Sequence, residues 1–379
     1  MTRFARRTFV RMVLGSAAAM VLADPRRACA ARIGDPIDEA LLAAGRFLAE
    51  RQSPDGGWRS ATYGGLRDGF ALTGPAGKVV LELAPFDPVL RRAGERALDR
   101  LVHSAPGPGA SVLDYPVYTA AMAAIALARH GRSDDDRAAR DAWLAQLRRQ
   151  QLDESLGWSE ADVDYGGFGY SPRPPRRPDD GDASRLPFAS DLSSTTFAVG
   201  ALAIAGGPED AARLAKANRF VERCQNWPHG DGGFFVSVSN PVQNKAGDFR
   251  SYGSATADGI RCLLRFGAGP DDPRLVAAAE WLRAHLPTET NPGDFIELRR
   301  AEQDGGAFYF AWSAGHALRG LRHALAEPWI DDAATALADG LLARQRADGS
   351  WRNPNPFMRE DDPVVATALA AGALGASRG

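Results

Sequence analysis

Carboxylate and hydroxyl side chains gather at residues 191–196, which read Asp191-Leu192-Ser193-Ser194-Thr195-Thr196. If this stretch opens a helix, its free backbone N–H groups favour an anion or a carbonyl oxygen of a ligand. The alternative is that Asp191 or Ser193 caps the helix. Asp164 and Asp362 could converge with Asp191, and two separated carboxylates permit general acid–base chemistry on a glycoside. Asp191 is therefore the candidate catalytic residue.

Aromatic side chains recur where other apolar runs begin. Tyr252 opens one such run, and Tyr309 and Trp312 lie at the start of the next. Aromatic rings around a cavity suit an isoprenoid chain, whose alkenes pack on ring faces, or a sugar ring that stacks flat. The alternative for each ring is ordinary core packing. The candidate ligand-binding residues are Asp164, Tyr165, Phe168, Tyr170, Ser193, Thr195, Tyr252, Ser254, Asp258, Tyr309, Trp312 and His316.

The apolar periodicity predicts twelve helices in six pairs. The first members are amphipathic, and the second members are rich in small residues and nearly free of charge, which predicts burial on all sides. The expected first members are residues 37–52, 86–104, 134–153, 210–226, 272–287 and 329–346. The expected second members are residues 70–83, 116–130, 192–206, 253–267, 308–323 and 363–376. Six outer helices around six buried ones predict an all-α (α/α)6 toroid in one domain, residues 31–379.

Long connections run over residues 157–190, 235–252 and 288–306, each between an outer helix and its inner partner. They should gather at one mouth of the toroid, where a ligand would enter. The glycine-rich stretch from Tyr165 to Tyr170 either acts as a lid or fills this mouth.

Two stretches share the same spacing of Gln, Gly and Trp, at Gln52 to Trp58 and at Gln345 to Trp351. Glycine accepts the positive φ that ends a helix, the Gln side chain can bond freed backbone groups, and the Trp can cover the gap between hairpins. Looser copies are expected at residues 151–158, 225–234 and 303–308. A recurring helix–turn–helix unit indicates a repeat architecture.

Residues 1–30 predict a twin-arginine signal peptide. Arg6-Arg7 precedes a weakly apolar run at 12–23 and an Ala28-Cys29-Ala30 cleavage signal. We expect an exported protein, periplasmic or secreted, without a transmembrane segment in the mature chain, because the run is too short to span a membrane. The remaining chain has 39 basic and 46 acidic residues, and this net charge of −7 opposes nucleic-acid binding.

Several motifs carry a family resemblance: residues 165–170 (YGGFGY), 190–197 (SDLSSTTF), 251–256 (SYGSAT), 344–351 (RQRADGSW) and 361–364 (DDPV). With these motifs in this order, the chain resembles the prenyltransferase and squalene oxidase repeat superfamily, and within it the exported bacterial squalene-cyclase-like proteins. The resemblance implies an (α/α)6 barrel around an apolar cavity.

The resemblance also shows which chemistry is missing. Type II terpene cyclases protonate an alkene with the central acid of an Asp-x-Asp-Asp-Thr-Ala motif. The equivalent stretch keeps the first Asp as Asp191 but has Ser193 and Ser194 at both later acid positions. Serine cannot supply the strong acid that this step needs, so we expect no squalene-cyclase activity.

Protein prenyltransferases hold zinc with an Asp-x-Cys pair and a His. Asp258 and Cys262 lie four residues apart and His316 lies on the next inner helix, so that spacing is absent. We expect no metal and no cofactor, and we expect Cys224 and Cys262 to be buried free thiols.

Three functions stay open. The first is binding, or transformation, of an isoprenoid-like hydrophobic molecule in the central cavity. The second is a glycan hydrolase or lyase, and the third is a non-catalytic toroid that binds a protein partner. An aromatic-lined cavity favours the first, paired carboxylates with shifted pKa values in an open groove favour the second, and a cavity filled by side chains favours the third.

Overall fold

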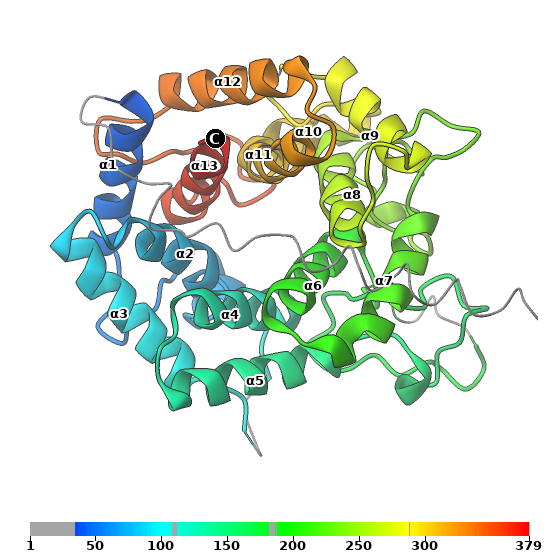
Figure 1. The fold of residues 1–379 in the computed structure, drawn as a ribbon, viewed down its shortest axis with the longest axis horizontal. Helices are drawn as coiled ribbons and strands as arrows, with labels where there is room; N and C mark the ends of the chain where they lie inside the picture. The colour runs from blue at the N-terminus through cyan, green and yellow to red at the C-terminus, as the bar shows by residue number, and fades with distance from the viewer. Residues whose placement is uncertain (1–34, 108–111, 182–185, 187, 288, 379) are drawn as a thin grey trace, which may run out of the picture.

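Two concentric rings of helices build the fold, as Figure 1 shows. The computed structural model describes residues 35–107, 112–181, 186, 188–287 and 289–378. Within these residues there are isolated antiparallel bridges but no strand. The predicted signal peptide lies outside the described residues, and export therefore stays a prediction.

The outer ring contains α1 (Pro36–Glu50), α3 (Pro88–His103), α5 (Asp134–Arg148), α7 (Ala211–Arg223), α9 (Pro273–Ala284) and α12 (Pro328–Ala343). The inner ring contains α2 (Thr73–Leu83), α4 (Pro116–His130), α6 (Leu192–Ala205), α8 (Gly253–Arg265), α11 (Ala307–Ala324) and α13 (Pro363–Ser377). Each inner helix packs against the next, and α13 returns to α2, so the ring is closed. The expected (α/α)6 toroid of six hairpins is confirmed.

The short elements lie in the connections between these helices. They are α10 (Arg300–Gly305) and the 3-10 turns Gly64–Leu66, Glu154–Leu156, Pro208–Asp210, Pro241–Gln243 and Glu297–Arg299. Some expected helix bounds were too wide. α5 ends at Arg148 rather than at 153, and α2 begins at Thr73 rather than at 70. In both places the extra residues belong to turns that join the two rings.

Small side chains let the inner helices approach closely. A Cβ added at Gly74 of α2 would lie 2.4 Å from Met122 Cβ of α4, and one at Gly372 of α13 would lie 2.7 Å from the Trp312 ring of α11. Alanine and glycine at such contacts allow close packing without voids. This explains why the inner helices read as apolar on all sides.

A glutamine clamp joins successive outer helices at four places. The Nε2 group of Gln52 donates to the carbonyl of Gly56 in its own turn and to that of Ala93 in α3, both at 2.9 Å. Gln345 bonds Gly349 and Ala40 of α1 in the same way. The other two copies are Gln151 with Gly166 and Arg213, and Gln225 with Gly232 and Arg274.

Each clamp contains a glycine with positive φ and an aromatic residue two positions later. The backbone N–H of that aromatic residue donates to a threonine of the following inner helix. The pairs are Trp58 with Thr73, Phe168 with Thr195, Phe234 with Thr256, and Trp351 with Thr367, at 3.0 to 3.1 Å. The unit therefore fastens an outer helix, its neighbour and its inner partner at one point.

Two of the expected copies were wrong in detail. The copy that begins at Gln151 ends at Phe168, not at Trp158, because Gln151 bonds Gly166. Gln303 lies within α10, and its side chain accepts a hydrogen bond from Arg300 on the surface, so it forms no clamp.

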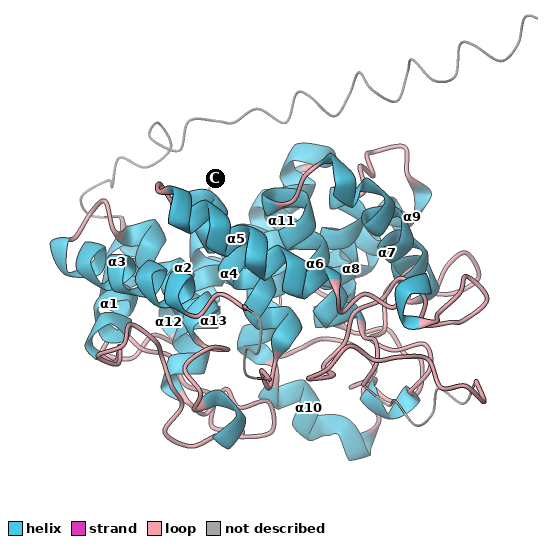
Figure 2. Cartoon of the chain, turned by 90° about the horizontal axis from the view of Figure 1, so that it is seen from below, coloured by secondary structure: helices cyan, strands magenta, loops and turns pink. Residues whose placement is uncertain are grey.

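The connections from outer to inner helices lie on one face of the toroid, the lower face in Figure 2. Among the described residues, no helix combines the length and the apolar character needed to cross a membrane. Cys224 and Cys262 are buried and are not joined by a disulfide, as expected.

Candidate functional site at the centre of the toroid

Half-buried side chains of the inner helices are the candidates for a surface along the axis of the toroid. Outer helices cover each inner helix on one side, and inner neighbours cover it on two others (Figure 1). The side of such a helix that stays open towards the middle of the ring therefore faces the axis. We infer this position for seven of the half-buried residues and call them the axial residues: Lys78, Tyr118, Ile125, Tyr309, His316, Val365 and Leu369. Burial lowers the pKa of His316 on α11, and the charge of Lys78 on α2 adds to this effect, although α13 lies between the two helices in the ring.

A chain of hydroxyl groups joins four inner helices at the end nearest the connections. Tyr118 Oη of α4 lies 2.8 Å from Ser193 Oγ of α6, which lies 2.5 Å from Tyr309 Oη of α11. Tyr309 donates to Asp258 Oδ2 of α8 at 2.8 Å. Tyr118 also donates to Tyr170 Oη at 3.1 Å. The network thus contains four of the residues predicted from sequence for the ligand site: Tyr170, Ser193, Asp258 and Tyr309.

Asp258 is the charged end of this network. It also accepts hydrogen bonds from Arg261 at 2.7 Å and from Ser313 at 2.5 Å. Burial raises the pKa of Asp258, and the nearby Arg261 guanidinium opposes that rise. Arg261 in turn lies over the Trp312 ring, 4.4 Å from its centroid. A buried carboxylate with this many donors is held in one position.

A row of aromatic rings runs beside the network. Tyr170 stacks on Tyr118 with centroids 5.6 Å apart, and Tyr118 meets Phe197 edge-on at 4.6 Å. Phe197 stacks on Trp312 at 5.0 Å, and Trp312 lies 6.1 Å from Tyr309. Aromatic contacts of this kind give an apolar surface of fixed shape.

Asp191 lies in the wall rather than on the axis. It is fully buried at the N-cap of α6, where Oδ1 accepts from the Ser194 backbone N–H and Oδ2 from its hydroxyl, both at 2.7 Å. Burial raises the pKa of Asp191 to about 7. The capping alternative describes this residue, because no part of its side chain is exposed to a ligand.

The three carboxylates that could have converged have separate partners. Asp164 accepts from Ser190 and Ser239, while Asp362 caps α13 and accepts from Ser60. Burial also raises the pKa of Asp164. Within the described residues, no hydrogen bond joins any two of the three.

Other candidate residues hold the wall together. Phe168 and Thr195 form one of the clamps, and Ser254 accepts a hydrogen bond from Asn291 at 3.1 Å. Tyr165 is buried against its own connection and donates to Glu154. Tyr165 and Phe168 are therefore fixed within the connection and the clamp, and a lid or a filled mouth at Tyr165 to Tyr170 stays a prediction. Tyr252 is fully buried and packs against Phe295.

The residues considered for zinc do not come together. Asp258 is engaged with Arg261, Cys262 Sγ lies 3.2 Å from Thr196 Oγ1, and His316 Nδ1 donates to the Trp312 carbonyl at 2.9 Å. Across the residues that the structure places, His, Cys, Asp and Glu form no group of three or more that could hold a metal ion.

Lys245 is the main site residue that sequence reasoning missed. It is half-buried in the connection before α8, and its ammonium lies 5.3 Å from the centroid of the Tyr309 ring. Burial lowers the pKa of Lys245, while Asp258 and Asp191 oppose that effect. Its rarity was an available signal, because the chain has only three lysines.

Phe197, Arg261 and Ser313 were also missed. Each lies three or four positions after a residue that was named, Ser193, Asp258 or Tyr309 respectively. Helical spacing puts such pairs on one face, so this signal could have found all three.

Comparisons with known proteins agree on the fold and not on the chemistry. No family model matches the chain. The DNA repair protein RecO of Methylorubrum populi is 40% identical over 62 residues, which cover 16% of this chain and 25% of RecO. The chain thus spans only a quarter of that relative.

Solved structures with a similar fold have different activities. A variant of the type II terpene cyclase MstE from Scytonema, in complex with geranylgeranyl dihydroxybenzoate, has a TM-score of 0.57 at 17% identity, covering 90% of this chain and 97% of that one. Cellobiose 2-epimerase from Spirochaeta thermophila gives 0.58 at 12%, covering 89% and 96%. The GH76A α-1,6-mannanase from Salegentibacter gives 0.59 at 13%, covering 91% and 99%. The fold and the site thus define an (α/α)6 toroid protein with an aromatic centre.

Proposed function

We propose that the protein binds an elongated, mainly apolar molecule of isoprenoid type along the axis of the toroid. The observation that carries this proposal is the apolar part of the axial residues. Ile125, Val365 and Leu369 keep accessible surface, and the buried rings of Phe197 and Trp312 stack on each other within the inner ring. Apolar walls with a few convergent polar groups are typical of small-molecule sites.

One end of the axis is polar, which suits a ligand with a polar terminus. At this end are the Tyr118 and Tyr309 hydroxyls and the Lys245 ammonium. Further along the helices, His316 lies at the same depth on α11 as Ile125 does on α4, and Lys78 of α2 pairs with Glu82. Three MstE structures contain geranylgeranyl dihydroxybenzoate as substrate or merosterolic acid A as product, which supports an elongated terpenoid in a toroid of this kind.

We infer binding rather than alkene protonation. Asp191 is engaged on both oxygens and fully buried, and Asp258 is held by Arg261 and two hydroxyls. Neither acid is free to transfer a proton to an alkene on the axis. The glycan alternative needs two carboxylates several ångströms apart, and Asp164, Asp191 and Asp362 each accept hydrogen bonds from separate partners.

The test is a binding titration with geranylgeraniol, together with mass spectrometry of small molecules that co-purify with the protein. Leu369→Trp fills the axis and should weaken binding at least about tenfold. Leu298→Trp is the matched control, because Leu298 is 85% exposed on the surface. Ile125→Phe serves as a second axial variant if Leu369→Trp does not fold.

Equal affinity for geranylgeraniol in the wild type and both axial variants would rule out the proposed axial site. Geranylgeraniol converted to a new product would show an enzyme instead of a binder. A protein that binds no isoprenoid and retains none would favour the partner-binding toroid.

A further inference from the structure

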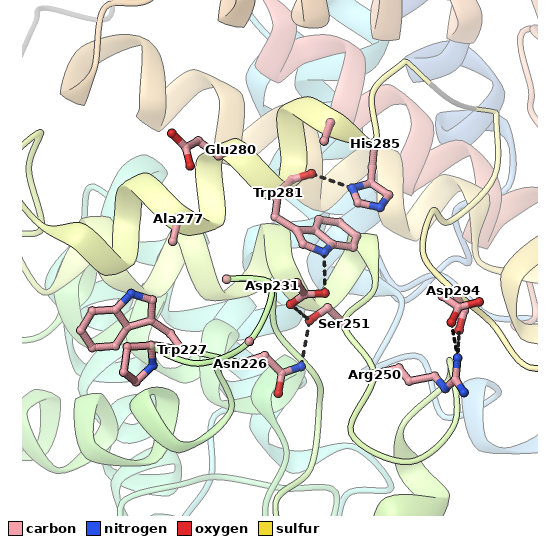
Figure 3. A pocket seen from close by; sticks show the side chains of 14 residues that line it. Asn226, Trp227, Asp231, Arg250, Ser251, Ala277, Glu280, Trp281, His285 and Asp294 are labelled. Carbon is pink, nitrogen blue, oxygen red and sulfur yellow. Dashed lines mark hydrogen bonds and ion pairs between the residues drawn. The ribbon is translucent and has the colours of Figure 1, made fainter.

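A second candidate site lies on the outside of the toroid, between α9 and the turn that follows α7. An open groove of about 670 Å³ lies there, and Figure 3 shows side chains that line it. One wall is a face of α9 that presents Ala277, Glu280, Trp281 and His285, and the opposite wall carries Trp227. The volume falls within the range of small-molecule sites, about 300 to 1,000 Å³. The axial residues do not line this groove.

The turn that carries Trp227 is longer than the clamp requires. Gln52 and Gln345 bond a glycine four positions later, whereas Gln225 bonds Gly232, seven positions later. In all three turns an Asp before that glycine accepts the N–H two positions on: Asp55 from Gly57, Asp231 from Gly233 and Asp348 from Ser350. The copy at Gln225 therefore contains three additional residues.

These additional residues do not serve packing. The two shorter copies form the complete clamp without them, and the longer turn leaves Trp227 41% exposed. Backbone hydrogen bonds nonetheless close the turn, because the Asn226 N–H donates to the Gly233 carbonyl and the Gly232 N–H donates to the Asn226 carbonyl, both at 2.9 Å. An exposed indole on an ordered turn is typical of a binding surface.

The opposite wall is fixed as well. Trp281 donates through its indole N–H to Asp231 at 3.0 Å, and the His285 ring stacks on it at 3.8 Å between centroids. Asp231 also accepts from Ser251 at 2.6 Å. Little movement is needed in the groove before a ligand binds, which lowers the cost of binding.

The charges of the groove select against anions. It contains three carboxylates, those of Asp231, Glu280 and Asp294, against one guanidinium, and that Arg250 group is already paired with Asp294. Glu280 is exposed and makes no hydrogen bond or ion pair with the residues that the structure describes. Phosphate, nucleotides and acidic lipids are disfavoured by this charge.

We propose that this groove is a carbohydrate-binding site, in which a neutral sugar ring packs on the exposed face of Trp227. The C–H face of a sugar ring suits an indole, and its hydroxyls suit carboxylates with spare acceptor capacity. Glu280 has such capacity, and Asn226 lies beside Trp227 at the edge of the groove. The site is separate from the axis and does not depend on the axial proposal.

The test measures binding of three neutral hexasaccharides, of β-1,4-linked glucose, β-1,4-linked mannose and N-acetylglucosamine, by calorimetry. At least one should bind, with an affinity that changes less than twofold between 50 and about 500 mM NaCl because the ligand is uncharged. Trp227→Ala should weaken binding at least about tenfold, and Trp227→Phe should weaken it less. Phe357→Ala, at a side chain that is 53% exposed outside the groove, should leave the affinity unchanged.

A second variant uses the repeat itself. Deleting residues 227–229 restores the four-residue spacing of the shorter clamps, so the melting temperature should change little while sugar binding is lost. The proposal is overturned if none of the three hexasaccharides binds, or if Trp227→Ala and the deletion bind as the wild type does. Geranylgeraniol binding should be the same in all these variants, which separates a failure here from a failure at the axis.

Discussion

Asp191 shows how a single buried acid can couple stability to pH. Its pKa is raised to about 7 by burial, far above the value of 3.8 for an exposed aspartate. The folded chain therefore holds this proton more tightly than the unfolded chain does. Between about pH 4 and pH 7 folding takes up a proton, so this contribution to stability is present at low pH and is lost as the pH rises towards 7.

Asp191→Asn should remove this dependence. The amide oxygen can still accept from the Ser194 N–H, and the amide N–H can donate to the Ser194 hydroxyl. Between pH 4.5 and 7, the slope of the unfolding free energy against pH should become less negative by up to about 1.4 kcal/mol per pH unit, which corresponds to one proton. Urea unfolding across this range measures it. An unchanged slope would mean that Asp191 does not titrate there, and Glu360, whose pKa burial also raises to about 7, would be the next acid to replace.

Glycines in the clamps set how closely the outer helices approach. Gly56 has φ +84°, and a Cβ there would lie 2.2 Å from the Arg96 carbonyl oxygen of α3. Gly267 has a similar φ of +91°, but an added Cβ would meet nothing within 4 Å. The two positions therefore separate the cost of backbone conformation from the cost of contact.

Gly267→Ala should lower the free energy of unfolding by about 1 kcal/mol, the cost of a left-handed conformation alone. Gly56→Ala should cost at least about 2 kcal/mol more, because α1 and α3 must move apart. Chemical denaturation of both variants gives the comparison. Equal losses would show that the contact with Arg96 relaxes freely.

The helices were predictable because their apolar periodicity is strong, and the clamps because Gln52 and Gln345 share one spacing. The clamp at Gln151 was misplaced for a physical reason. An insertion separates Gln151 from Gly166 and contains its own Gly157-Trp158 pair, and only the folded chain shows which glycine meets α7. Trp158 instead lies in a small separate core with Tyr165.

The site was predictable where it follows a helix and not where it follows a connection. Tyr309, Trp312 and His316 share a face of α11 by their spacing, and in the structure Tyr309 and His316 are half-buried and Trp312 is buried. Lys245 reaches the same place from a loop, so its position depends on the packing of that loop. Sequence also left open whether Asp191 or Ser193 caps α6, and the structure shows Asp191 as a fully buried N-cap.

The whole molecule is a ring, and the Gln345 clamp closes it. Gln345→Ala should remove two hydrogen bonds, leave the Ala40 and Gly349 carbonyls without this partner, and lower the free energy of unfolding by about 1 to 3 kcal/mol. Gln303→Ala is the control, since that side chain makes only a surface contact with Arg300. It should change stability by less than about 0.5 kcal/mol. Urea unfolding followed by tryptophan fluorescence measures both, and equal effects would show that the closing clamp contributes nothing special.

The hydrogen bond from Gln345 to Ala40 joins residues 305 positions apart, and this has a consequence for the synthesis of the chain. A nascent chain with five hairpins outside the ribosome is an open arc, with an uncovered apolar edge at each end. Neither edge is protected until the last hairpin emerges and meets the first. Interrupted translation would therefore release arcs whose edges fit one another, and such fragments are expected to pair or to engage chaperones.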